Sequence, residues 1–303
     1  MLTYHSHGKL LITGEYLVLD GAMALAVPTK LGQSLTVRPI SQRVIQWKST
    51  TVDQKTWLDF TLNLDQISGT ELVNKKLEYY HVLLALRHIY SLKPSLFEQH
   101  GYLMQSHLEF PTNWGLGSSS TLINNLAQWA NVNPYTLNDE VFGGSGYDIA
   151  CASSDGPIYY QRLDGESTIL SAPFEPEFHE SLWFVHMNNK QNSRESIRHY
   201  AKKGPADANA IQEVNEIAQR LTRCQTLELF CELIERHETI ISSAIGIPKI
   251  SETLFPDFSG TLMSLGGWGG DYVLATGSEK AVRSYFEPKG FKTIQAYHQL
   301  IKI

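Results

Sequence analysis

Short apolar runs, separated by glycine and proline, fill the first part of the chain, a pattern typical of a β-meander. It predicts strands at residues 10–13, 17–19, 24–27, 34–38 and 44–48. From residue 71 to residue 92 the apolar positions recur at helical spacing, until Lys93 and Pro94 end the run. At residues 101–110 every second residue falls on one predominantly apolar side, which predicts another strand before Pro111. This part of the chain thus predicts a sheet and one long helix.

In the rest of the chain, segments with a strand pattern and segments with a helical pattern follow one another. A helix is predicted at residues 118–129, and Asn133 with Pro134 caps a second one that runs toward Glu140. Further elements are predicted as strands at residues 157–163, 182–186, 261–265, 271–276 and 291–296, and as helices at residues 194–203, 208–222, 226–245 and 279–286. The polar stretch at residues 163–168 is the predicted linker. We therefore expect two α+β domains, over residues 1–163 and 164–303.

Composition and charge narrow the range of partners. The 303 residues are 42% hydrophobic and 18% charged, as in ordinary globular proteins. A net charge of −6, without a stripe of Lys and Arg, argues against nucleic acid. No run approaches the roughly 18 apolar residues of a membrane span, the first residues do not form a signal peptide, and three cysteines without metal spacing fit a reducing compartment. We expect a soluble, cytoplasmic protein with a small-molecule ligand; the oligomeric state, a homodimer included, stays open.

The strongest chemical signal is the segment Pro111-Thr112-Asn113-Trp114-Gly115-Leu116-Gly117-Ser118-Ser119-Ser120, which lies between a predicted strand and a predicted helix. Such a turn directs free backbone amides outward, at the positive end of the helix dipole, and glycine lets the backbone approach a phosphate closely. The alternative is an ordinary glycine turn with serine N-caps. It is not a Walker loop, because no Gly-Lys-Ser/Thr follows the first glycine at the required spacing.

Three further segments combine glycines with candidate chemical groups. Residues 8–21 place Lys9, Glu15 and Tyr16 around a tight turn, where lysine can neutralise a phosphoryl group and a carboxylate can accept a hydroxyl proton. Residues 142–150 deliver Asp148 through a glycine-rich turn. Residues 264–271 contain four glycines in five positions. The alternatives are a plain hairpin with a surface lysine for the first segment and a helix cap for the second.

Taken together, these segments resemble the GHMP kinase superfamily, named after galactokinase, homoserine kinase, mevalonate kinase and phosphomevalonate kinase. Residues 8–15, 111–120 and 264–270 are similar to its three motifs in order and spacing. Ser145-Gly146-Tyr147-Asp148 is similar to the segment that carries the catalytic aspartate of mevalonate kinases, and residues 188–193 resemble the start of their second domain. Departures from the pattern include Asn113, Tyr16 and Leu265. The metal-binding glutamate that mevalonate kinases carry ahead of the catalytic aspartate has no counterpart at matching spacing, and Glu140 and Asp139 are the candidates to replace it.

The resemblance implies a two-domain GHMP kinase fold, with an N-terminal domain like ribosomal protein S5 and a ferredoxin-like C-terminal domain. It implies ATP and Mg²⁺ as cofactors, Asp148 as the catalytic base or orienting group, and Lys9 as the stabiliser of developing charge. It implies nucleotide binding by Trp114, Gly115, Leu116, Gly117, Ser118, Ser119 and Ser120. Substrate contacts are expected from Glu15, Tyr16 and Lys190, and metal contacts from Ser119 and Glu140.

The expected activity is transfer of the γ-phosphate of ATP to a hydroxyl group, with mevalonate as the preferred acceptor. A phosphomevalonate kinase is the nearest alternative, because Lys190 and Arg194 can supply extra positive charge for a phosphorylated substrate. A related decarboxylase would use ATP similarly but release carbon dioxide and inorganic phosphate. A non-catalytic nucleotide or metabolite sensor is compatible with the altered motif glycines.

Overall fold

The chain forms two compact units. The computed structural model describes residues 1–189, 197–198, 200–266 and 270–303. Unit 1 comprises residues 1–8, 31–112 and 116–153, and unit 2 comprises residues 9–30, 113–115 and 154–303. The domain boundary after residue 163 stays a prediction. None of the helices formed by the described residues combines the length and the apolar composition that a membrane crossing needs.

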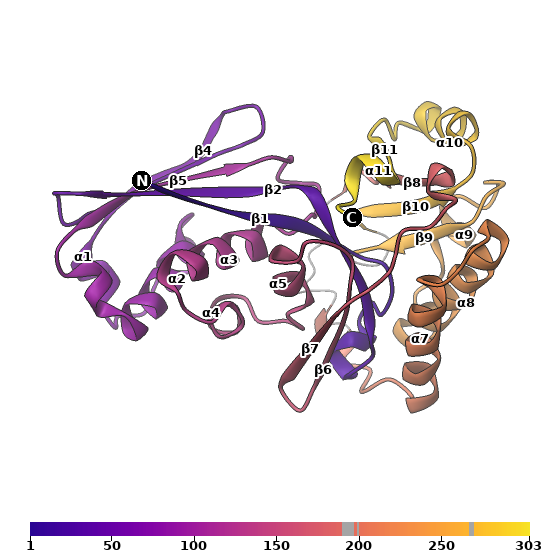
Figure 1. Ribbon diagram of the computed structural model, residues 1–303, viewed down its shortest axis with the longest axis horizontal. Helices are drawn as coiled ribbons and strands as arrows, with labels where there is room; N and C mark the ends of the chain where they lie inside the picture. Colours follow the sequence, from indigo (N-terminus) through magenta and orange to yellow (C-terminus); the bar gives the residue numbers. More distant parts are fainter. Residues whose placement is uncertain (190–196, 199, 267–269) are drawn as a thin grey trace. The chain divides into compact units, whose positions relative to one another are not determined.

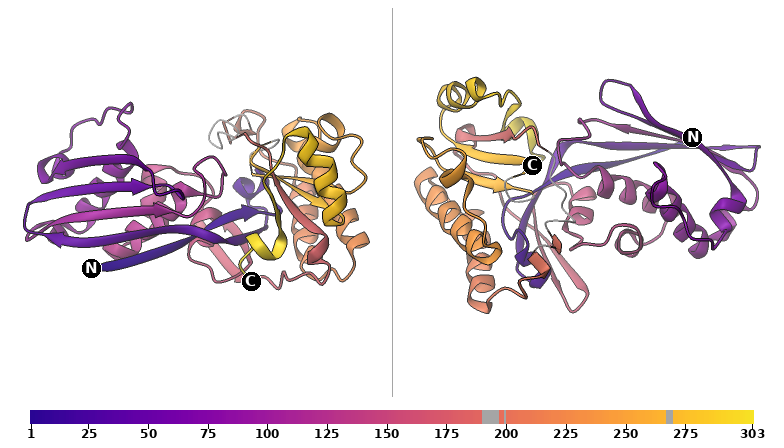
Figure 2. Two further views of the ribbon diagram at one scale, coloured as in Figure 1. Left: turned by 90° about the horizontal axis from the view of Figure 1, so that it is seen from above. Right: turned by 180° about the vertical axis from the view of Figure 1, so that it is seen from behind.

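Unit 1 is built on a mixed sheet (Figures 1 and 2). Its strands follow the order β4 (Thr56–Asn63), β3 (Val44–Thr50), β5 (Gly101–Leu108) and β2 (Ala24–Ile40), and β1 (Leu2–Leu11) also pairs with β2. β3 and β5 are parallel, whereas β4 with β3 and β5 with β2 are antiparallel. Alternate residues of β3 are buried, the pattern of a strand with one covered face.

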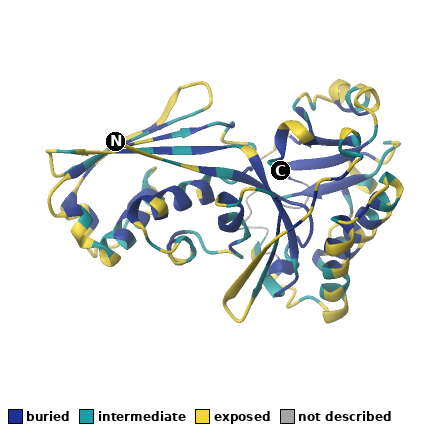
Figure 3. Ribbon diagram, viewed as in Figure 1, coloured by how far each residue is buried: buried dark blue, intermediate teal, exposed yellow. Residues whose placement is uncertain are grey.

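Helices cover that face of the sheet in unit 1 (Figure 1). They are α1 (Leu64–Ser68), α2 (Tyr80–Leu92), α3 (Ser118–Ala130), α4 (Pro134–Val141), α5 (Tyr147–Ala152) and the 3-10 helix η2 (Pro94–Phe97). Trp47 of β3, Leu86 of α2 and Ile123 of α3 belong to one apolar core. Most residues of α3 are buried (Figure 3). This packing fixes α3 against the sheet.

Unit 2 contains a second sheet, which is antiparallel throughout. Its order is β11 (Ile294–Ala296), β8 (Leu182–His186), β10 (Tyr272–Thr276) and β9 (Leu262–Leu265). Every residue of β8, β9 and β10 is buried, which explains why these strands read as continuous apolar runs. On one face Val282 and Phe286 of α10 (Glu279–Phe286) share a core with Val185 and Val273.

Two long helices and a hairpin complete the parts of unit 2 that matter for the site. α8 (Leu227–Ile245) packs against α7 (Ala208–Leu221) and against β9. β6 (Ile158–Leu163) and β7 (Glu166–Ser171) pair as an antiparallel hairpin. The shorter helices are η1 (Leu17–Asp20), η3 (His179–Ser181), α9 (Ile250–Thr253), η4 (Glu287–Lys289) and α11 (Tyr297–Leu300).

Much of the predicted secondary structure is confirmed. The prediction of the α+β class is confirmed. β8 and α10 have the predicted bounds, and α3, α7 and α8 differ from theirs by one residue. Asn133 caps α4 as expected, because its side chain accepts the N–H of Tyr135 at 2.8 Å. The predicted helix at residues 194–203 lies partly outside the described residues.

The predicted long helix was wrong at its start, because α2 begins only at Tyr80. The Asn74 side chain accepts the N–H of Lys76 at 3.0 Å, a local bond that competes with helix formation, and Leu72 is fully exposed.

The prediction of a linker at residues 163–168 was also wrong, because these residues belong to the β6–β7 hairpin. Asp164 and Gly165 both have positive φ, as a two-residue hairpin turn requires.

The predictions for residues 17–38 were also partly wrong. Residues 17–19 belong to the 3-10 helix η1, because Gly14 and Gly21 turn the chain on either side at φ 89° and 91°. The strands predicted at residues 24–27 and 34–38 are one strand, β2. Pro28 and Gly32 are tolerated within it because they lie between the residues that pair with β6 and those that pair with β5.

Candidate active site

The glycine-serine loop ends at the start of α3 as the sequence predicts. Gly117 is left-handed, with φ 90° and ψ 43°, and its carbonyl accepts the N–H of Thr121 at 3.0 Å. No side chain of the described residues caps this helix. The first amides of a helix have no partner within the helix, so those of residues 118–120 point outward, where the helix dipole favours an anion.

The three serines of the loop differ in exposure. Ser120 is buried, and its hydroxyl donates to the carbonyl of Gly117 at 3.0 Å. Ser119 is exposed and Ser118 is half-buried. The hydroxyls of Ser118 and Ser119 are therefore better placed to reach a ligand than the hydroxyl of Ser120, which serves the local backbone.

Neutral polar groups fasten the start of α3 to the sheet. The hydroxyl of Thr121 donates to Oε1 of Gln33 at 2.5 Å, and Nε2 of Gln33 donates to the hydroxyl of Ser106 at 2.6 Å. Gln33 lies on β2 and Ser106 on β5. All three side chains are buried. The turn after the glycine loop is thus held by a satisfied network of hydrogen bonds, which we call the Gln33 network.

The same network extends one turn along α3. The carbonyl of Gln33 accepts from Nδ2 of Asn125 at 2.8 Å. Oδ1 of Asn125 accepts the hydroxyl of Ser6 at 2.8 Å, and that hydroxyl accepts from Asn124 at 2.9 Å. No member of the network carries a charge, so its hydrogen bonds do not depend on pH in the neutral range.

Asp148 lies in the first turn of α5, which begins after the left-handed Gly146. Its Oδ1 accepts the N–H of Ile149 at 3.1 Å, and its side chain is half-buried. A carboxylate in the first turn is stabilised by the helix dipole. Lys9, the other predicted catalytic residue, is the eighth residue of β1 and is 9% exposed. The two residues belong to different units.

The beginning of the glycine-serine loop and the third glycine segment meet within unit 2, at the buried carboxylate of Asp271. A Cβ atom on Gly115 would lie 2.2 Å from Cγ of Asp271, and one on Gly266 would lie 2.8 Å from Oδ2 of the same residue. Both glycines also have positive φ, 69° and 88°. Only glycine fits at either position. Sequence reasoning did not give Asp271 a role, although a carboxylate directly after a glycine-dense stretch is a usable signal.

His186 and Trp114 fix the residues just before Gly115. Nε2 of His186 donates to the carbonyl of Asn113 at 3.1 Å, and its Nδ1 accepts the N–H of Asn188 at 3.3 Å. The ring of Trp114 lies 6.1 Å from that of His186 and 6.3 Å from that of Tyr272. Packing therefore accounts for one side of Trp114, and its role beside a nucleotide base stays a prediction.

The first glycine segment forms a tight turn. The N–H of Leu17 donates to the carbonyl of Glu15 at 2.6 Å across Tyr16, whose φ of 60° and ψ of −45° are those of a strained γ-turn. The ring of Tyr16 is half-buried and lies 5.5 Å from that of Tyr200. Tyr200 in turn donates its hydroxyl to Asp20. Tyr16 is thus held in place by its neighbours.

The side chain of Glu15 turns into unit 2. Glu15 is 2% exposed, and burial raises the pKa of its carboxyl well above the ordinary value. The backbone N–H of Glu15 itself lowers this pKa, but by less. The charge of Glu238 raises this pKa further. The predicted substrate contact of Glu15 stays a prediction, and Lys190, the third predicted substrate residue, lies outside the described residues.

Comparison with known proteins identifies the fold. No protein-family model and no curated protein matches the sequence. Among solved structures, phosphomevalonate kinase from Streptococcus pneumoniae in complex with phosphomevalonate and AMPPNP matches 98% of this chain and 100% of its own, with a TM-score of 0.72 and 15% identity. The structure of L. major mevalonate kinase in complex with R-mevalonate covers 100% of this chain and 96% of the kinase chain, with a TM-score of 0.68 and 15% identity. The chain has the GHMP kinase fold.

The GHMP kinase fold leaves the acceptor open. Galactokinase from Lactococcus lactis, complexed with galactose, matches 99% of this chain and 93% of its own, with a TM-score of 0.67 and 14% identity. The neighbours with this fold are thus kinases of different acceptors.

The two residues predicted to bind a metal, Ser119 and Glu140, have exposed side chains in unit 1. Ser119 lies in the first turn of α3, and Glu140 lies near the end of α4. Nowhere in the described part of the chain do three His, Cys, Asp or Glu side chains gather as a metal cluster. Mg²⁺ commonly takes only one or two protein carboxylates and completes its shell with phosphates and water, which is compatible with this pair.

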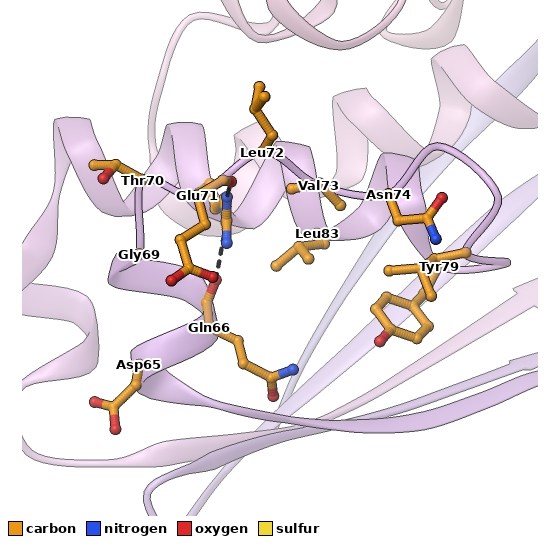
Figure 4. Close-up of a pocket in the computed structure, with 12 residues that line it drawn as sticks. Asp65, Gln66, Gly69, Thr70, Glu71, Leu72, Val73, Asn74, Tyr79 and Leu83 are labelled. Carbon is orange, nitrogen blue, oxygen red and sulfur yellow. Dashed lines mark hydrogen bonds between the residues drawn. The ribbon is translucent and has the colours of Figure 1, made fainter.

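A surface pocket of about 570 Å³ also lies in unit 1, between α1 and α2 (Figure 4). Arg87 closes one side of it by donating to the carbonyls of Gln66 and Glu71. None of the predicted site residues lines it. The pocket is therefore a separate feature from the glycine loop.

Proposed function

We propose that the protein is an ATP-dependent small-molecule kinase that phosphorylates a hydroxyl group, with mevalonate as its preferred acceptor. One observation carries the proposal. In the segment at residues 115–120, the left-handed Gly117 leads into the uncapped start of α3, and Gly115 is fitted against a carboxylate from the third glycine segment. The similarity to solved kinases of the GHMP fold supports the same conclusion.

The nucleotide is proposed to bind through the backbone of the loop. The amides of residues 115–120 and the dipole of α3 favour the β-phosphate, and the hydroxyls of Ser118 and Ser119 are placed to bond phosphate oxygens. Ser119 and Glu140 are the proposed protein ligands of Mg²⁺, which neutralises phosphate charge when bound. Trp114 is proposed to flank the base.

The proposed reaction is a direct phosphoryl transfer. The acceptor oxygen forms a bond to the γ-phosphorus, the bond between that phosphorus and the bridging oxygen breaks, and ADP leaves with the bonding electrons. Asp148 takes the hydroxyl proton, and Lys9 stabilises the charge on the phosphoryl oxygens. Tyr16 and Lys190 are the proposed acceptor contacts.

Phosphomevalonate is the second candidate acceptor. The structure of a phosphomevalonate kinase matches this chain with a TM-score of 0.72, over the whole of that protein. A phosphorylated acceptor needs additional positive charge, for which Lys190 and Arg194 are candidates. The ratio of kcat/KM for mevalonate and phosphomevalonate separates the two, and a much higher value for phosphomevalonate or for a hexose would reject the mevalonate assignment.

The proposal is tested at Asp148. Asn has nearly the same shape but lacks the charge, so Asp148→Asn removes the base with little change in packing. We expect kcat to fall at least about a hundredfold, while the affinity for ATP, measured by calorimetry, changes little. Asp59→Asn, at an exposed residue of β4, is the control and should retain full turnover. Near-normal turnover of Asp148→Asn would remove this residue from the mechanism.

A further inference from the structure

Three ionisable side chains are buried together in unit 2. Glu15 of the first glycine segment is 2% exposed, and the adjacent residues His237 and Glu238 of α8 are 0% and 1% exposed. Ionisable groups are rarely buried this completely without a hydrogen-bonding or functional reason. Sequence reasoning did not single out His237 or Glu238.

His237 holds the first glycine segment. Its Nε2 accepts the N–H of Gly14 at 3.0 Å, so the ring proton lies on Nδ1. Oε2 of Glu15 lies 3.4 Å from the same Nε2. Burial lowers the pKa of His237 to about 3, so this ring is uncharged at neutral pH, and burial raises the pKa of Glu15 well above its ordinary value, which favours the uncharged carboxyl. Within the described chain, neither oxygen of Glu15 has a hydrogen-bond partner of good geometry.

Glu238 holds the third glycine segment. Its Oε1 accepts the N–H of Ser264 at 3.2 Å, and its Oε2 lies 3.3 Å from the hydroxyl of the same residue. Burial raises the pKa of Glu238 to about 8. The hydrogen bonds from Ser264 lower this pKa, the charge of Glu235 raises it further, and the charge of Lys249 lowers it. Ser264 lies on β9, two residues before Gly266.

We propose that His237 and Glu238 form a positioning dyad, which holds the first and the third glycine segments at a fixed separation, and that Glu15 acts through this dyad instead of contacting the acceptor. The inference rests on the proposed kinase function only for its consequence in catalysis. The hydrogen bonds that define the dyad stand without it.

The dyad connects the two sides of the proposed reaction within unit 2. The turn held by His237 carries Tyr16, a proposed acceptor contact. The strand held by Glu238 leads to Gly266 and Asp271, which pack against Gly115 of the proposed nucleotide loop. A displacement of about 1 Å between reacting groups can lower a rate about a hundredfold. A shift of either segment should therefore lower kcat more than it changes KM for ATP.

The discriminating pair of variants is Glu238→Gln and Glu238→Leu. Gln reproduces the protonated carboxyl, because its oxygen accepts the Ser264 N–H and its amide donates to the Ser264 hydroxyl. Leu removes both bonds. We expect Glu238→Gln to keep kcat at pH 7 within about twofold and Glu238→Leu to lower it at least about tenfold, with KM for ATP changed less than about threefold. Glu232→Gln, exposed on the same helix, is the matched control and should have no effect.

The pH profile separates positioning by the uncharged dyad from a merely structural role. Ionised Glu238 would place a charge among Glu15, His237 and Ser264, so kcat of the wild type should fall as the pH rises through about 8. Glu238→Gln should lack this alkaline decline. Equal profiles for the two proteins, or equal losses in the Gln and Leu variants, would overturn the proposal.

Glu15→Gln tests the third member of the cluster. If Glu15 acts through the dyad as an uncharged group, Glu15→Gln keeps KM for the acceptor within about threefold. A direct contact between a Glu15 carboxylate and the acceptor predicts a rise of at least about tenfold in that KM, equivalent to one lost hydrogen bond to a charged group. The second result would overturn the role that we infer for Glu15.

An amide spectrum tests the dyad even if the protein transfers no phosphate. In the ¹H–¹⁵N correlation spectrum, Glu238→Leu should shift the signals of Gly14, Gly115 and Gly266, whereas Glu238→Gln should leave them in place. Shifts confined to the Ser264 segment would show that the two glycine segments are not coupled. A wild type without turnover on any acceptor, but with coupled shifts, would reject the proposed function and leave the dyad standing.

Discussion

The two units stabilise their candidate site residues with opposite chemistry. In unit 1 the start of α3 is held by the Gln33 network, whose amides and hydroxyls are neutral at every pH in the ordinary range. In unit 2 the first and third glycine segments are held by His237 and Glu238, which can gain or lose a proton. The difference teaches that one half of the proposed site is insensitive to pH, and the other half depends on staying uncharged.

The largest effect is expected from crowding at Gly115. Gly115 in unit 2 and Gly143 in unit 1 have almost the same φ, 69° and 70°, but only Gly115 is crowded. Gly143→Ala should lower the free energy of unfolding by about 1–2 kcal/mol, for the left-handed backbone alone. Gly115→Ala adds the contact with Asp271 and should lose about 2–5 kcal/mol in total, together with nucleotide binding. Denaturant titration and calorimetry check both values, and equal losses would contradict the close approach.

A smaller effect is expected from pH, and only in unit 2. Folded protein keeps the Glu238 proton up to about pH 8, whereas the unfolded chain releases it near 4.5. The stabilisation is therefore fully present below the unfolded value and is lost as the pH rises through about 8. Between pH 6 and pH 8 the wild type should lose about 2–3 kcal/mol relative to Glu238→Gln. If the free energies of unfolding of the two proteins changed equally with pH, the proton on Glu238 would not be the source of this stabilisation.

The Gln33 network should respond to a lost hydroxyl at every pH. Thr121→Val keeps the shape of the side chain but leaves Oε1 of Gln33 without its donor. We expect a loss of about 1–2 kcal/mol in the free energy of unfolding, the same at pH 6 and at pH 8. Thr121→Ser, which keeps the hydroxyl, should retain most of this stability. A loss that changes with pH would break the contrast between the two units.

The smallest effect is expected at a charge that is not buried. Arg236 precedes the dyad on α8 and pairs with Glu213, but its side chain is 56% exposed. An exposed ion pair contributes little. Arg236→Met should therefore leave the unfolding midpoint within the error of the wild type. A clearly lower midpoint for Arg236→Met would mean that this exposed ion pair contributes to the stability of α8.

The fold could be predicted well where local patterns agree with the packing. β8 is a continuous apolar run covered on both faces, and α10 is a short amphipathic helix, so both have the predicted bounds. The prediction failed at residues 17–19, where a three-residue apolar run cannot be distinguished from a helical turn by periodicity. It also failed at residues 71–79, where a local Asn74 bond replaces the helix.

The candidate site could be predicted only where glycine marks it. Gly115 and Gly117 follow a recognisable pattern, and their positive φ values explain it. His237 and Glu238 escaped notice because they occupy the apolar stripe of an amphipathic helix, beside Leu233, Ile234 and Ile241. Two ionisable residues on such a stripe are a signal that sequence reasoning can use. Which segments they reach depends on long-range packing, which no local pattern contains.

The central claim, phosphate transfer from ATP to a small-molecule hydroxyl, is tested most directly by phosphorus NMR of the reaction products. Wild-type protein is incubated with ATP, Mg²⁺ and, in separate samples, mevalonate, phosphomevalonate, homoserine and hexoses. We expect ADP and one phosphorylated acceptor to appear in equal amounts, fastest with mevalonate, and Asp148→Asn to slow their formation at least about a hundredfold. Inorganic phosphate with carbon dioxide, or unchanged ATP in every sample, would contradict the claim.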